Sequence, residues 1–181
     1  MTTTGQQTRT EAAYFSYGTQ FYVAARFAIS NRFIQVAGRL FHDAVEYYLN
    51  GVLSRTMPHD DRKDLNHRLN DIWSHFKRVA NDPDLDRFDY TIQTLDVLWD
   101  LRYPDSPPAL TPRGFLLSWV EDEFVIPERK VGEKSYLLAP SRIEELVHAI
   151  YQVAGVNIEA IRRTLGPQAL YVFDHMNPPG C

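Results

Sequence analysis

Apolar residues recur at steps of three and four positions through most of the chain, which is the spacing of one face of an α-helix. One such row consists of Leu65, Leu69, Ile72, Phe76 and Val79. A row of this kind is typical of the packed face of an antiparallel helical bundle. The pattern predicts five helices, over residues 11–30, 33–53, 62–79, 83–103 and 140–165. Asp82 and Pro83 suit the start of the fourth helix, and Ser141 with Glu144 forms a capping box at the start of the last.

The helix predicted over residues 33–53 is apolar on most of its surface. Its polar residues form one narrow stripe, made of Arg39, Asp43, Glu46 and Asn50. A helix with this distribution is usually central in a bundle, with the stripe facing solvent or a neighbouring helix. We therefore predict an all-α fold, an up-down antiparallel bundle of about five helices.

The helical rhythm stops between residues 104 and 139. This stretch predicts an insertion, with two short extended runs around a polar Gly turn that we interpret as a small β-hairpin within residues 113–138. The remaining organisation is simple: a disordered N-terminus over residues 1–10, a single domain over residues 11–165, and a C-terminal tail over residues 166–181.

Composition narrows the class of protein. A chain of 181 residues suits one domain, and a net charge of −4 argues against a protein that coats nucleic acid non-specifically. The single cysteine, Cys181, excludes an internal disulfide framework and a Cys-based zinc cluster. The N-terminus lacks the apolar region of a secretory signal, and no apolar stretch approaches the length of a membrane span. We expect a cytoplasmic protein without membrane contact.

Most familiar chemical motifs are absent, including a Gly-rich phosphate loop, HExxH and GxSxG. His42 and Glu46 lie one helical turn apart, and so do Asp71 and His75, a spacing at which two side chains can meet one ion. Helix surfaces produce such pairs by chance, and solvated faces or intrahelical hydrogen bonds explain them. We predict no metal site and no cofactor.

Four segments, taken in order, resemble one family. They are "HDAVEYYLNGVL" (residues 42–53), "LNHRLNDIW" (65–73), "LRYPD" (101–105) and "SRIEELVHAIYQVA" (141–154). The set resembles HEPN domains, helical bundles of which one group is partnered with small nucleotidyltransferases. The resemblance covers roughly residues 11–105 and 140–155. Two features depart from it: Asn50 stands where many relatives have Lys, and the insertion is larger than the usual connector.

The resemblance implies a homodimeric protein that acts by binding. Its partners would be a nucleotide, RNA or a nucleotidyltransferase-type protein, in a toxin–antitoxin or defence setting. The contact residues that it implies are Glu46, His67, Arg102 and Asp105. The same four residues also have an explanation that needs no binding site. They can be ordinary polar residues of a helix surface or part of a turn that ends a helix.

Two other functions remain open. Some HEPN proteins are metal-independent endoribonucleases, in which an Arg is followed after four to six residues by a His, and two protomers share the cleft. Arg142 and His148 have this spacing, but so do Arg62 with His67 and Arg68 with His75. Six residues on a helix also correspond to about 120° of rotation and about 9 Å of rise, so Arg142 and His148 do not share a face. The third candidate is a structural or regulatory adaptor without enzymatic activity.

The endoribonuclease hypothesis makes a direct prediction. A purified chain with this activity cleaves RNA in the presence of EDTA, because His transfers the proton and Arg stabilises the charged phosphate without a metal. His148→Ala should abolish the cleavage and leave the helical circular dichroism spectrum unchanged. RNA that stays intact in EDTA would contradict the hypothesis.

Overall fold

The computed structural model describes residues 4–100, 115–119 and 134–175. Within these ranges the chain forms eight α-helices, one 3-10 helix and two short strands. The elements in chain order are α1 (Thr4–Ser30), α2 (Ile34–Leu53), α3 (His59–Asp64), α4 (Leu69–Ala80), η1 (Pro83–Phe88), α5 (Asp89–Asp100), β1 (Phe115–Trp119), β2 (Lys134–Leu138), α6 (Pro140–Ala154), α7 (Ile158–Arg162) and α8 (Pro167–His175).

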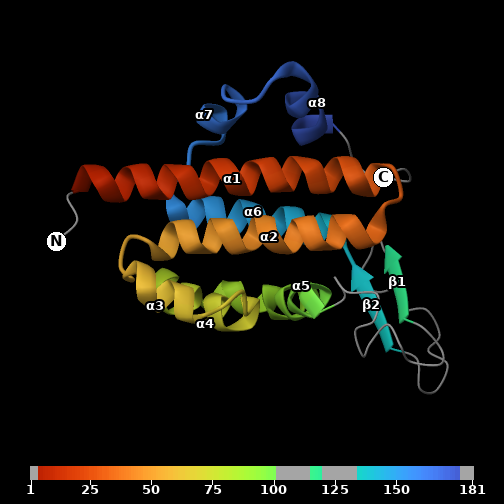
Figure 1. The fold of residues 1–181 in the computed structure, drawn as a ribbon, viewed down its shortest axis with the longest axis horizontal. Helices are drawn as coiled ribbons and strands as arrows, with labels where there is room; N and C mark the ends of the chain where they lie inside the picture. The colour runs from red at the N-terminus through yellow and green to blue at the C-terminus, as the bar shows by residue number, and fades with distance from the viewer. Residues whose placement is uncertain (1–3, 101–114, 120–133, 176–181) are drawn as a thin grey trace.

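The helices pack in layers around α2 (Figure 1). The long helices α1 and α2 lie side by side, and α2 also packs against α4, α5 and α6. The helices α7 and α8 lie on the opposite side of α1 from α2, and α8 contacts α1. The predicted all-α bundle is therefore confirmed. None of the described helices is both long enough and apolar enough to cross a lipid bilayer.

The close approach of α1 and α2 depends on small residues between them. Gly18 of α1 faces the ring of Tyr48 on α2, and a Cβ atom at Gly18 would lie 2.6 Å from the Tyr48 ring carbon Cε1. Ala25 of α1 and Ala44 of α2 are fully buried as well. The helix backbones can approach this closely only because these positions carry little or no side chain.

A chain of hydroxyl groups links three helices inside the core. Tyr151 of α6 donates to the Tyr48 hydroxyl at 2.7 Å, and Tyr48 donates to Thr19 Oγ1 of α1 at 3.3 Å. Thr19 in turn donates to the carbonyl of Phe15 at 2.8 Å. Burial raises the pKa of both phenols, so both remain protonated donors. A buried hydroxyl without a hydrogen-bond partner destabilises the fold. This series of hydrogen bonds therefore constrains how α1, α2 and α6 are rotated relative to one another.

The helix predicted over residues 62–79 is interrupted, so its predicted first turns are wrong. The helix α3 ends at Asp64, and Asn66 and His67 have positive φ angles of 46° and 60°. This left-handed conformation cannot continue a right-handed helix. The helix α4 begins at Leu69, whose N–H donates to the Asp96 carboxylate of α5 at 2.6 Å. A carboxylate from a packed neighbour therefore caps α4.

Both ends of the chain are more helical than predicted. The predicted disorder of residues 1–10 is wrong from Thr4 onward, because α1 begins there and an ion pair between Glu11 and Arg55 ties its first turns to the end of α2. The tail predicted over residues 166–181 contains α8, which begins at Pro167 because proline suits the first helical turn.

The predicted capping box of Ser141 and Glu144 is also wrong. The helix α6 begins at Pro140 with Ala139 as its N-cap, so Ser141 lies one residue inside the helix. The Glu144 carboxylate instead accepts a hydrogen bond from buried Arg26 of α1 at 3.0 Å. The Glu144 side chain therefore forms an ion pair between α6 and α1 instead of capping the start of its own helix.

The β-hairpin predicted within the insertion is wrong. The strands β1 and β2 pair in parallel, with Phe115 opposite Lys134 and Trp119 opposite Leu138. Parallel strands need a long crossover and cannot be joined by a tight turn. The rest of the predicted insertion over residues 104–139 lies outside the described residues, apart from Ala139.

The contact at Gly18 predicts opposite effects for two glycine substitutions in the same helix. Gly18→Ala should destabilise the protein by about 1–3 kcal/mol, because the new methyl group overlaps the ring of Tyr48, which is fully buried and held by its hydroxyl. Gly5→Ala, where a Cβ atom meets nothing within 4 Å, should be neutral or stabilise by up to about 1 kcal/mol. Urea unfolding of both variants tests this, and equal effects would contradict the packing argument.

Candidate functional site

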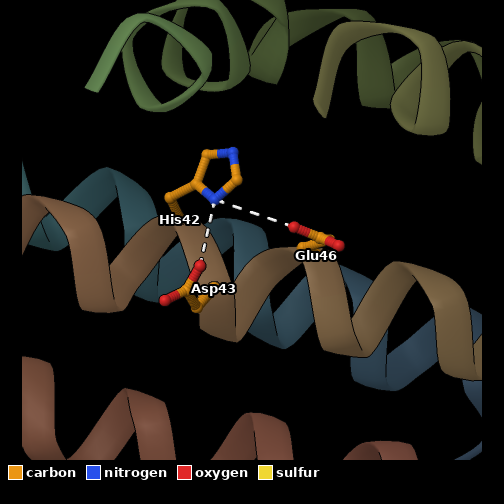
Figure 2. A group of neighbouring side chains, drawn as sticks. All are labelled: His42, Asp43 and Glu46. Carbon is orange, nitrogen blue, oxygen red and sulfur yellow. Dashed lines mark hydrogen bonds and ion pairs between the residues drawn. The ribbon is translucent and has the colours of Figure 1, made fainter. Parts of the chain in front are cut away.

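The polar stripe of α2 carries the most concentrated group of chemically active side chains in the described structure. His42, Asp43 and Glu46 place one ligand atom each within 4.8 Å of one another. Figure 2 shows the His42 ring on the side of α2 that faces α4 and α5, with the carboxylates of Asp43 and Glu46 beside the α2 ribbon. Positions 42 and 46 are one helical turn apart, so their side chains lie on the same face, and position 43 is adjacent.

His42 is fully buried, yet its Nδ1 atom points at two carboxylates. The atom lies 3.4 Å from Asp43 Oδ1 and 3.9 Å from Glu46 Oε2. Both distances are longer than the donor–acceptor distance of about 2.7–3.2 Å in an ordinary N–H···O hydrogen bond. The imidazole therefore lies between the two acids at ion-pair range.

Asp43 is held in its ionised form. Its burial raises the pKa of the carboxyl group, but hydrogen bonds from His42 and Arg39 outweigh this and leave the pKa below its ordinary value. The Arg39 Nε–H donates to Asp43 Oδ2 at 3.0 Å from one helical turn away. The second oxygen, Asp43 Oδ1, is the one that faces His42.

The Glu46 carboxylate is also in contact with a second histidine, which comes from another part of the fold. His67 Nδ1 lies 2.8 Å from Glu46 Oε1 and 3.1 Å from Oε2. His67 belongs to the connection between α3 and α4, and its left-handed backbone is part of the break that the periodicity did not predict. The structure thus joins two of the predicted contact residues, 21 positions apart in the chain. We call His42, Asp43, Glu46 and His67 the His–carboxylate cluster.

The described structure does not bring the other predicted site residues into this cluster. Arg102 and Asp105 are outside the described residues. Arg142 forms an ion pair with Glu145 on its own helix at 3.0 Å, and its side chain is 31% exposed. His148 is exposed further along α6. Within one protomer the described contacts do not bring Arg142 and His148 together, as their spacing predicts.

The sequence shows the one-turn spacing of His42 and Glu46, and the resemblance implies Glu46 as a contact residue, but nothing in the sequence pattern assigns His42 to a site. The spacing was visible, but the pattern could not show that His42 is fully buried or that His67 approaches the same carboxylate. A signal was present, because His42 lies in a run with the buried residues Phe41, Ala44 and Val45. A histidine on the apolar side of a central helix needs polar partners nearby.

A second feature is an apolar groove of about 770 Å³ between α1 and the segment around α8. Its walls include Phe27 and Tyr171, which are 52% and 60% exposed. The groove lining contains no charged side chain and no histidine. It offers mainly apolar contact, so the candidate chemistry lies at the His–carboxylate cluster.

Comparison of the chain with protein-family models, with curated proteins and with solved structures finds no match in any of the three. The function is therefore argued from the residues and their geometry.

The lowered pKa of Asp43 predicts a specific pH dependence of stability. A carboxyl group whose pKa is lower in the folded state than in the unfolded state stabilises the fold above its unfolded pKa of about 3.9, and this stabilisation is lost as the pH falls through the folded value. Asp43→Asn should cost about 1–2 kcal/mol near pH 6, and the difference from the unsubstituted protein should shrink below about pH 4. Urea unfolding at several pH values measures this difference.

The matched control is Asp71→Asn. Asp71 forms an exposed ion pair with Arg68, so its replacement should cost well under about 1 kcal/mol at every pH. A pH-independent cost for Asp43→Asn would show that the ionised carboxylate is not what stabilises the cluster.

Proposed function

We propose that this chain is a HEPN-like helical bundle that acts by binding a protein partner of the nucleotidyltransferase type, in a toxin–antitoxin or defence setting. The observation that carries the proposal is the contact between Glu46 and His67. Both residues belong to segments that resemble the family, and they come from separate elements. Two polar residues that come from separate elements and meet at a partly exposed position can bind a partner together. Polar residues scattered over the surface cannot do this.

The charge of this region favours a cationic group of a protein over a phosphate. Asp43 and Glu46 contribute two carboxylates within a few ångströms, and Arg39 is engaged with Asp43. Two carboxylates this close repel a phosphate group and attract the Arg or Lys of a partner. RNA and nucleotides are therefore the competing ligands, and we expect the chain to bind them with lower affinity than the protein partner.

The endoribonuclease remains a second candidate because of one observation. The Arg142 side chain is partly exposed and His148 is exposed, so a second copy of the chain can approach both. The ion pair of Arg142 with Glu145 would have to open for the guanidinium to reach a phosphate. A structural adaptor that uses the apolar groove is the third candidate.

Co-expression tests the partner proposal. The chain is expressed together with an affinity-tagged nucleotidyltransferase encoded beside it, and the complex is measured by size-exclusion chromatography and calorimetry. The double variant Glu46→Gln with His67→Asn should weaken the complex at least tenfold, since it removes one charge and one hydrogen bond from the contact surface. Glu159→Gln is the control, because Glu159 is an exposed acid on α7 that pairs with Arg162.

Two further measurements use the same protein. A fluorescent single-stranded RNA and ATP are titrated separately, and both should bind more weakly than the nucleotidyltransferase. Tight binding of RNA or ATP without any protein complex would contradict the partner proposal. A genome in which no nucleotidyltransferase gene adjoins this one would also count against it.

A further inference from the structure

We infer that the His–carboxylate cluster is a binding site for one divalent transition-metal ion, with Zn²⁺ as the first candidate. The ligands are His42 Nδ1, one oxygen each of Asp43 and Glu46, and His67 Nδ1. This inference does not rest on the proposed partner, since metal binding is a property of the isolated chain.

The spacing of the ligand atoms suits a shared ion. In a tetrahedral site with metal–ligand distances of about 2.0–2.2 Å, neighbouring ligand atoms lie about 3.4 Å apart. His42 Nδ1 lies 3.4 Å from Asp43 Oδ1 and 3.9 Å from Glu46 Oε2, and the three ligand atoms of the helix lie within 4.8 Å of one another. Small rotations of the two carboxylates bring these atoms to coordination distance.

His67 completes the set from a second element. Its Nδ1 atom already lies 2.8 Å from Glu46 Oε1, and His42 Nδ1 faces the other oxygen of the same carboxylate at 3.9 Å. Its side chain is 50% exposed, which leaves it room to move. On metal binding, the His67 ring takes the tautomer with its proton on Nε2, so that the Nδ1 lone pair faces the ion.

The chemistry of the ligands selects the class of metal. Two imidazole nitrogens with two carboxylates suit Zn²⁺ and related first-row ions, whereas Mg²⁺ and Ca²⁺ prefer oxygen ligands throughout. Three ligands are largely protected from water: His42 is fully buried, and the side chains of Asp43 and Glu46 are each 16% exposed. Arg39, bound to the outer oxygen of Asp43, keeps that carboxylate ionised and oriented.

The two carboxylates also explain why a cation is favoured. Asp43 and Glu46 are closer together than two isolated acids prefer, and the Nδ1 atom of the buried His42 imidazole lies 3.4 Å from one carboxylate and 3.9 Å from the other. A divalent ion replaces these long contacts with four short bonds and neutralises both acids.

Isothermal titration calorimetry with ZnCl₂ tests the inference on untagged protein that has been dialysed against a chelator and then freed of it. We expect one Zn²⁺ per chain. Glu46→Gln and His67→Asn should each weaken Zn²⁺ binding at least tenfold. Asparagine is chosen at position 67 because it tolerates the left-handed backbone there and is too short to ligate as His67 does.

His59→Asn is the matched control, since His59 is an exposed histidine on α3 outside the cluster, and its replacement should leave the affinity unchanged. Circular dichroism checks that each variant is folded, and His67→Asn decides the result alone if Glu46→Gln does not fold. Three outcomes would overturn the inference: no stoichiometric Zn²⁺ binding, equal weakening by His59→Asn and His67→Asn, or binding of Mg²⁺ as tight as that of Zn²⁺.

Discussion

The fully buried hydroxyl of Tyr48 is the interaction on which the arrangement of the bundle depends. A phenol deep in a core needs hydrogen-bond partners, and Tyr48 finds them in Thr19 of α1 and Tyr151 of α6. Meeting both partners allows α2 only a narrow range of rotation. Because Glu46 is two residues before Tyr48, it points about 200° away around the helix. The hydrogen bonds of Tyr48 to α1 and α6 therefore also orient the polar stripe, with Glu46, toward the side of α2 that lies away from these bonds.

The other half of the His–carboxylate cluster depends on how α4 begins. Asp96 of α5 accepts from the first backbone amide of α4, which lets the chain end α3 early and turn through Asn66 and His67. The turn places the imidazole of His67 against Glu46. The same break that shortens a predicted helix thus brings a second histidine to the cluster, and both the partner proposal and the metal inference use this contact.

Periodicity was sufficient for the bundle and for the central position of α2, because the apolar face of a packed helix repeats every three to four residues wherever its neighbours lie. It was insufficient where a distant group competes with a local preference. Glu144 pairs with Arg26 instead of capping α6, and the parallel pairing of β1 with β2 has no local signature. In the cluster, the spacing of His42 and Glu46 was visible in the chain, whereas the burial of His42 and the approach of His67 were not.

The amino-acid sequence alone determined the all-α class, the extent of α2 and the polar stripe along it, since these follow from the order of apolar and polar residues on a helix of fixed pitch. The tertiary structure decided which face of α2 meets α1, where α4 starts, and which residues meet Glu46. These depend on side chains that are far apart in the chain, such as Asp96 with Leu69 and His67 with Glu46. Such pairs are specified only when the packed core brings their helices together.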